Sequence, residues 1–322
     1  MGGVSGYLFR RFVQAVLVVL GVILIVFLLS QVVPGGEARA VLGPRATVAQ
    51  VRQFDRLNGL SDPLWLQFWH YLAGLPQLRL GYSYKFTQPV WAIIRQRLPK
   101  TLVLVGVSIT LALLIAIPLG VFQVVRRHKP SDYALTSVSF VLYAAPTFFI
   151  GTLLIIWFAF DLHVLPVAPP SDASPWAVFT DPRAFVMPVL TLSATTIAAF
   201  SRYMRSSLLD AMAEDYIRTA RAKGATSRRV LYGHALRNAL IPIITLIGLS
   251  LPAIVSGAVI VESIFNYPGM GLLVVQAAEN TDVPLVLGTT LVATVATVTG
   301  SLLADILYVL ADPRIRYTGL PA

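Results

Sequence analysis

The residues that most often carry out chemistry are few in this chain and lie far apart. The chain has no cysteine, and its four histidines, His70, His128, His163 and His234, are widely separated. Disulfides, thiolate metal sites and cysteine nucleophiles are therefore excluded, and a histidine-rich metal or haem site is not expected. The phosphate-binding pattern G-x-x-x-x-G-K-[ST] is also absent, so we do not expect the chain itself to hold ATP.

Two carboxylates remain as candidates because they lie near the ends of long apolar stretches. Glu262 lies near the outer end of one such stretch, and Asp305 lies near the inner end of another. Ionisable residues inside a membrane often mark a pathway or a gate. The alternative interpretation is that each carboxylate lies close enough to an interface to be hydrated or paired.

The elements that position these residues are apolar helices. Hydrophobic residues make up 56% of the 322-residue chain and charged residues 12%, with a mean hydropathy of +0.74. A water-soluble domain is nearer one quarter charged, so we predict an all-α integral membrane protein. Pro146 and Pro252 are expected to kink their helices without ending them. A spanning helix needs about 18 or more apolar residues, and we assign six segments: 12–33, 102–125, 135–160, 185–200, 240–264 and 284–310.

The orientation follows from Lys and Arg in the segments between the spans. With the N-terminus in the cytoplasm, the cytoplasmic segments hold fifteen Lys and Arg residues, and the two short outer loops hold only Arg183. The long 34–98 loop is not counted, because long loops cross largely regardless of charge. Both termini are therefore predicted to be cytoplasmic. This distribution accounts for the net charge of +10 without nucleic-acid binding.

The first apolar segment could also be a signal peptide, since Arg10 and Arg11 precede it and Ala38-Arg39-Ala40 resembles a cleavage site. Its apolar length exceeds the 7–15 residues of a signal core. We therefore predict a retained anchor.

The outer loop, 34–98, is predicted to form a small helical cap. Apolar residues recur there at helical spacing, first at Val48, Val51, Phe54 and Leu57 and then at Leu64, Phe68, Tyr71 and Leu72. The cap could serve as a docking surface for another protein, or it could consist of amphipathic helices that lie on the membrane.

The loop between the fourth and fifth spans, 202–238, is too long for a simple turn. We predict a helix over 207–222, supported by an i,i+4 pair between Glu214 and Arg218. Gly224 is expected to end this helix as a left-handed C′ residue.

A second short helix is expected to follow, capped by Thr226 or Ser227. The two helices would then form a rigid projection. On composition alone the loop could instead be a basic interfacial helix held by anionic lipids.

The sequence of this loop closely resembles the EAA loop of ABC importer permeases, most of all those of the dipeptide and oligopeptide branch. It has DYIRTARAKG over 215–224 and HALRNA over 234–239, followed by Pro242. Arg218-Thr219-Ala220 stands where the general consensus has Glu-Ala-Ala. The resemblance covers nearly the whole chain: ESIFNYPGMG over 262–271, DPRIRY over 312–317, Arg10-Arg11 and Pro34-Gly35 also fit the family. Arg79-Leu80-Gly81-Tyr82-Ser83 departs from the family's Gly-Asp-Leu-Gly-x-Ser.

The resemblance implies a type I ABC importer permease fold with six transmembrane helices. The regions would be 1–33 with the first helix, 34–98 as the extracytoplasmic loop, 99–312 as a five-helix core and 313–322 as a cytoplasmic tail. Within the core, the coupling loop 202–238 would dock on an ATPase. The coupling residues carried over from the family are Tyr216, Thr219, Ala220, Arg221, Ala222, Lys223, Gly224, His234, Arg237 and Asn238.

The resemblance also implies partners. They are a homologous second permease, two ABC ATPase subunits or domains that bind ATP and Mg, an extracytoplasmic binding protein and the bilayer of the cell membrane. The chain itself would bind no cofactor and catalyse no reaction.

Several alternatives stay open. Nickel, glutathione or haem could replace dipeptides or oligopeptides as cargo, because permeases of this type share the same motifs. A secondary transporter would be expected to show mid-span carboxylates and internal repeats. A membrane-embedded enzyme would need clustered polar residues. The sequence shows none of these features.

Overall fold

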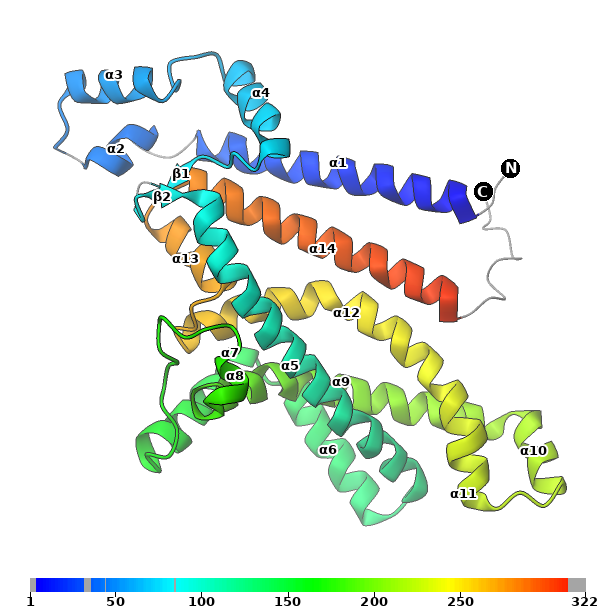
Figure 1. Ribbon diagram of the computed structural model, residues 1–322. Coiled ribbons are helices and arrows are strands. Elements are labelled where there is room, and N and C mark those ends of the chain that lie inside the picture. The colour runs from blue at the N-terminus through cyan, green and yellow to red at the C-terminus, as the bar shows by residue number, and fades with distance from the viewer. Residues whose placement is uncertain (1–3, 32–35, 44, 84, 312–322) are drawn as a thin grey trace. The chain divides into compact units, whose positions relative to one another are not determined.

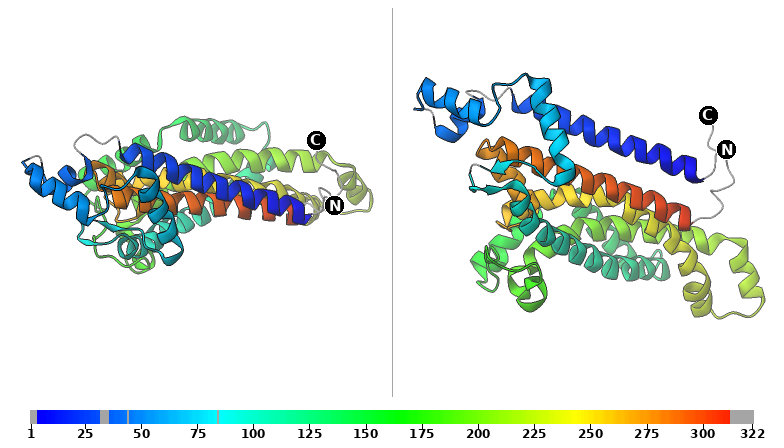
Figure 2. Two further views of the ribbon diagram at one scale, coloured as in Figure 1. Left: turned by 90° about the horizontal axis from the view of Figure 1, so that it is seen from above. Right: turned by 45° about the horizontal axis from the view of Figure 1, so that its top comes forward.

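The computed structural model describes residues 4–31, 36–43, 45–83 and 85–311, and it is predominantly helical (Figure 1, Figure 2). The chain divides into two compact units. Unit 1 comprises Met1–Thr101 and Pro268–Thr299, and unit 2 comprises Leu102–Tyr267 and Gly300–Ala322. The all-α prediction is confirmed, apart from one hairpin of two-residue strands.

Unit 1 contains the first helix, the outer loop and a later helical segment. Its elements are α1 (Val4–Ser30), α2 (Gly36–Leu42), α3 (Val48–Leu57), α4 (Leu64–Gly74), η1 (Leu75–Gln77), β1 (Tyr82–Ser83), β2 (Gln88–Pro89), α13 (Met270–Glu279) and the first parts of α5 (Val90–Val125) and α14 (Val283–Ala311).

The predicted helices of the outer loop are present as α3 and α4. Thr47 and Gln50 form a capping box at the start of α3. The start of α14 packs on Phe27 of α1 in the same apolar cluster as Phe68 and Tyr71 of α4. The Phe27 and Phe68 ring centroids are 5.3 Å apart, and burial raises the pKa of the Tyr71 phenol. These aromatic contacts fix α4 to the end of α1.

The β1–β2 hairpin is held by a buried carboxylate at the start of α14. Asp282 is 2% exposed and accepts hydrogen bonds from the Ser83 hydroxyl (2.5 Å) and the Lys85 amide (3.2 Å). Its other oxygen accepts from the Leu285 amide (3.3 Å), so Asp282 also caps α14. Gly81, at φ +90°, brings the backbone close to the Pro284 ring.

Unit 2 holds the longest run of packed helices. Its elements are the rest of α5, α6 (Pro130–Ala144), α7 (Thr147–Leu154), η2 (Ile155–Asp161), α8 (Ala177–Thr180), η3 (Pro182–Ala184), α9 (Val186–Ala213), α10 (Asp215–Ala222), α11 (Ser227–Arg229), η4 (Val230–Ala235), α12 (Leu236–Ile264) and the end of α14.

The core of unit 2 forms where α9 packs on α5 and α12. A Cβ on Gly120 of α5 would lie 2.7 Å from the Met204 Cβ of α9, so only glycine permits this approach. One apolar cluster surrounds Phe185 and Phe265, and a second surrounds Met204 and Leu208. Helix α9 is thus the central element of the unit.

Within the described residues, five of the six predicted spans fall on one helix each, apart from a few end residues, and the sixth, 135–160, covers two helices. Within the part of the chain that the structure describes, four helices are long and apolar enough to cross a membrane: Phe9–Leu29, Val90–Val125, Ser227–Gly248 and Val283–Leu302. The pair α6 and α7–η2 adds a fifth if it is one bent span. The remaining predicted segment, 185–200, lies in α9, a continuous helix of 28 residues.

The expectation that Pro146 only kinks its helix is wrong. Helix α6 ends at Ala144, and Pro146 caps the N-terminus of α7, so that the axes of α6 and α7–η2 differ by 104°. Ala145 is extended (φ −70°, ψ 130°), as the residue before a proline prefers. Pro252, in contrast, lies within the unbroken helix α12, as predicted.

Candidate functional site

The 202–238 loop differs from the prediction at its first helix. The predicted helix 207–222 is interrupted at Glu214, whose extended backbone (φ −68°, ψ 151°) separates α9 from α10. The reason is packing. In one straight helix Ile217 would face away from Leu208, because nine residues at 100° each bring it to the opposite side. The interruption lets both side chains enter the same apolar cluster, with Ile217 only 1% exposed.

The predicted pair between Glu214 and Arg218 is consequently not the one that forms. Glu214 lies outside α10, and Arg218 instead lies 3.5 Å from Asp215, one turn away. The two side chains are 80% and 93% exposed. An ion pair so exposed contributes little to stability.

Gly224 ends α10 as predicted. Its φ is +80°, in the left-handed region that favours glycine. The Ala225 amide donates to the Ala220 carbonyl (3.1 Å), and the Gly224 amide donates to the Arg221 carbonyl (2.9 Å). These two bonds define a Schellman motif, which satisfies the last carbonyls of the helix. The direction of the chain after α10 is therefore set by local hydrogen bonds.

The second helix of the loop is longer than predicted. Thr226 is its N-cap and accepts a bond from the Arg229 amide (3.4 Å). The helix then runs through α11 and a π-helical segment, η4, directly into α12. The second part of the loop is thus the beginning of α12, and only α10 is a separate short helix (Figure 1).

The structure brings the predicted coupling residues onto two adjacent elements. Seven of them, Tyr216 and Thr219 to Gly224, lie on α10 and its turn, and the other three lie on η4 and the start of α12. Helix α10 packs against η4. All ten are exposed except Ala220, which is half-buried. Buried Ile217 anchors the opposite face of α10, so the projection presents its basic residues outward.

Sequence reasoning missed a second basic feature of the loop. A pocket of about 420 Å³ is lined by Thr226, Arg228, Arg229 and Tyr232. In the charge count for orientation, these two arginines contribute only to the positive charge of the loop. The sequence signal for this pocket is the pair of consecutive arginines just after the Thr226 cap, followed by Tyr232 one helical turn later.

The two carboxylate candidates have different outcomes. Glu262 is fully buried in unit 2, and its backbone carbonyl accepts a bond from the Tyr267 amide (2.8 Å). The carboxylate therefore has no surface exposed to water. Asp305 lies on α14, but its side chain is outside the described residues.

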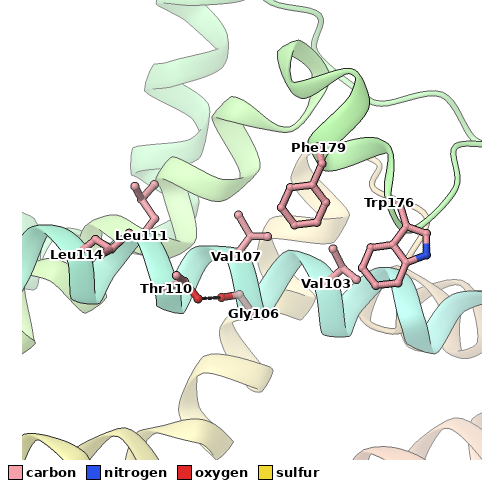
Figure 3. Close-up of a pocket in the computed structure, with 8 residues that line it drawn as sticks. All are labelled: Val103, Gly106, Val107, Thr110, Leu111, Leu114, Trp176 and Phe179. Carbon is pink, nitrogen blue, oxygen red and sulfur yellow. Dashed lines mark hydrogen bonds between the residues drawn. The ribbon is translucent and has the colours of Figure 1, made fainter.

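An apolar pocket of about 500 Å³ lies along α5 (Figure 3). The Thr110 hydroxyl donates to the Gly106 carbonyl (2.8 Å), so this polar group is satisfied within the helix. The rings of Trp176 and Phe179 stack at 6.4 Å on one side of the pocket. The lining residues are Val103, Gly106, Val107, Thr110, Leu111, Leu114, Trp176 and Phe179.

Two family models match almost the whole chain. The binding-protein-dependent transport system inner membrane component matches residues 108–317, and the N-terminal part of such membrane components matches residues 4–105. The chain belongs to this family. It is therefore a multi-pass membrane subunit of an ABC transporter complex, and the choice between a permease and a secondary transporter is decided for the permease.

Relatives match the permease over nearly its full length. The oligopeptide transport system permease protein AppB of Bacillus subtilis is 38% identical, covering 97% of this chain and 100% of its own. The probable D,D-dipeptide transport system permease protein DdpB of Escherichia coli is 36% identical (94% and 95%). The glutathione transport system permease protein GsiC of Salmonella typhi is 34% identical (97% and 99%).

Two of the family motifs in the permease, Pro34-Gly35 and DPRIRY over 312–317, lie outside the described residues. Gly81 and Ser83, from the motif that departs from the family, hold the outer hairpin. Sequence reasoning also missed the pair Asp132 and Arg205, because 73 residues separate them. No local pattern reveals such a pair.

Proposed function

We propose that the permease forms part of the pathway by which an ATP-driven importer carries dipeptides or oligopeptides across the cytoplasmic membrane. The observation that carries this proposal is the projection made by α10, its glycine turn and the capped start of α12. It is anchored by Ile217, exposes basic residues, and continues directly into a spanning helix. A protein that docks on this projection can therefore move α12 as a rigid body.

The partner that docks there is an ABC ATPase. The chain has no phosphate-binding loop, so ATP and Mg are held by separate subunits and this subunit has no hydrolytic activity. The ten residues from Tyr216 to Asn238 assigned above form the docking surface. A homologous second permease completes the pathway, and an extracytoplasmic binding protein delivers the cargo. Glu262 and Asp305 are candidates for gating in the spans.

Peptide cargo is favoured because relatives that match over 94% or more of this chain are named for oligopeptide and dipeptide transport. Glutathione, itself a small peptide-like molecule, is the second candidate, supported by the GsiC relatives. Nickel and haem stay as further alternatives. These cargo candidates can be ranked by measuring how fast the reconstituted assembly takes up a labelled dipeptide, a pentapeptide, glutathione, nickel and haem.

The division of labour between subunits can be measured with purified proteins. We expect the permease alone to hydrolyse no ATP, and the full assembly to hydrolyse ATP faster when loaded binding protein is added. A permease preparation free of other ATPases that still hydrolyses ATP would contradict the proposal.

The proposed orientation places both termini in the cytoplasm. Reporter fusions near Arg127, Arg221 and Arg316 should report a cytoplasmic location, and fusions near Arg56 and Asp172 an external one. A cytoplasmic Arg56 would overturn the orientation derived from the Lys and Arg distribution.

A further inference from the structure

Helix α6 is attached to the rest of unit 2 in an unusual way. Its only buried residues are Asp132 and Ser139, both polar. Three of its large apolar side chains, Val138, Phe140 and Val141, are more than half exposed, whereas Leu135 and Leu142 are half-buried. Helix α6 therefore has no fully buried apolar side chain, in contrast to α9, whose buried residues are mostly apolar.

Polar contacts therefore make up the buried part of its attachment, and the one with the best-defined geometry is an ion pair with α9. Arg205 donates from Nε to Asp132 Oδ1 (3.1 Å) and from a terminal nitrogen to Oδ2 (2.9 Å). The second oxygen also accepts from the His128 amide (3.2 Å), in the turn before α6. Asp132 is 2% exposed, whereas the Arg205 side chain is 29% exposed. The two-point geometry fixes orientation as well as distance.

A second arginine of α9 holds α6 further along. Arg202, one turn before Arg205, lies over the rings of Phe140 (5.0 Å) and Tyr143 (4.9 Å). In addition, Gln123 of α5 donates to the Thr136 hydroxyl at 3.3 Å. Charged and polar contacts thus join α6 to α9 and α5. Among them, the bidentate pair of Asp132 and Arg205 has the best-defined geometry.

Helix α9 is in turn packed firmly against α10, which we call the coupling helix. Ile217 of α10 is buried in one apolar cluster with Phe200, Met204 and Leu208 of α9. Arg205 lies next to Met204 in the sequence, within the part of α9 that forms this cluster. Helix α7, beyond the bend, packs closely on α9 and α12, since a Cβ on Gly151 would lie 3.3 Å from Thr191 and Phe265. Among these helices, α6 is the one whose buried residues are all polar.

We propose that Asp132 and Arg205 are positioning residues for transport, which make α6 move together with α9 when the coupling helix α10 is displaced. This inference rests on the proposed function, because it needs α10 to be the docking site of an ATPase. The pair stays closed throughout the cycle. If the pair is broken, ATP hydrolysis continues, but α6 no longer moves together with α9.

The test compares variants in the full reconstituted assembly, with labelled pentapeptide as the transported probe. Asp132→Asn removes the charge, and Arg205→Lys keeps the charge but removes the two-point geometry. Arg127→Gln, exposed in the turn before α6, removes one charge as the matched control. We expect both pair variants to keep basal ATP hydrolysis. The ATP consumed per peptide should rise between about twofold and thirtyfold, the range expected for a residue that carries coupling.

A double variant provides a reversible version of the same test. The chain has no cysteine, so Asp132→Cys with Arg205→Cys introduces the only thiols of this subunit. We expect a raised ATP-to-peptide ratio when the thiols are free, and a ratio close to wild type after bridging with a short bis-methanethiosulfonate reagent. The wild-type assembly tests the proposed function, and the comparison with the variants tests the pair.

Two results would overturn the inference. In the first, the variants lose thermal stability, hydrolysis and uptake in proportion, with an unchanged ATP-to-peptide ratio, as a purely structural pair would. In the second, the bridged double variant hydrolyses ATP but takes up no peptide, which would show that the pair must open during the cycle.

Discussion

The turn between α10 and α11 and the hairpin between β1 and β2 are both short connections, but different contacts hold them. The first is fixed by bonds among residues at most five positions apart, from Ala220 to Arg229. Nothing lies within 4 Å of a Cβ built on Gly224. The second depends on Asp282, which lies 199 residues after Ser83. A surface that must meet another protein can be shaped locally, whereas a hairpin packed on its own unit needs a distant partner.

The largest expected effect comes from removing the distant partner. Asp282→Ala leaves the Ser83 hydroxyl and the Lys85 and Leu285 amides without their acceptor, at a cost of about 3 kcal/mol or more. We expect a lower thermal midpoint of the purified subunit and faster proteolysis within 82–89. Asp282→Asn, which keeps one carbonyl oxygen as an acceptor, should lower the thermal midpoint less. An unchanged midpoint in Asp282→Ala would remove the contrast between the two connections.

Gly224→Val should have a smaller effect on stability but a severe effect on transport. A Cβ at φ +80° costs about 1–2 kcal/mol through backbone strain alone, because there is space for the side chain. We expect normal membrane abundance, reduced co-purification of the ATPases and loss of uptake. Gly233→Ala is the control, since its Cβ would meet the Arg229 Cγ at an ordinary 3.8 Å. If Gly224→Val takes up peptide at the wild-type rate with the ATPases fully bound, the idea that the Gly224 turn shapes the docking surface is wrong.

Thr226→Ala should have the smallest effect. The cap bond to the Arg229 amide is long at 3.4 Å, so we expect the lower part of the usual range, about 0.5–1 kcal/mol. The measurement is the thermal midpoint together with the salt concentration that releases the ATPases. Thr226→Ser keeps the hydroxyl and should match the wild type. A fall in the thermal midpoint as large as that of Asp282→Ala would mean that the turn is held by more than its local hydrogen bonds.

The same contrast explains which features could be predicted from the sequence. The Gly224 turn and the outer helices α3 and α4 depend on neighbouring residues and agree with the prediction, and the cap is Thr226, one of the two residues predicted for it. Five of the six apolar segments also fall on single helices as predicted, because length and composition indicate them, whereas 135–160 is broken at Pro146.

The missed features depend on contacts between distant residues. The interruption at Glu214 follows from the need to bury Ile217 beside Leu208, which appears only once the helices are packed. The full break at Pro146 could have been anticipated only in part, since proline restricts the preceding residue but does not dictate whether a helix bends or ends. The pairs of Asp282 with Ser83 and Asp132 with Arg205 join residues that no periodicity connects.

The Asp132–Arg205 pair also has a consequence for the order in which the chain is made. Asp132 leaves the ribosome 73 residues before Arg205, which at ordinary rates of synthesis is about 4 to 15 s. During that interval the carboxylate belongs to a helix whose apolar side chains already suit lipid, while its own partner does not yet exist. The ion pair that joins α6 to α9 can therefore form only after α9 has been synthesised.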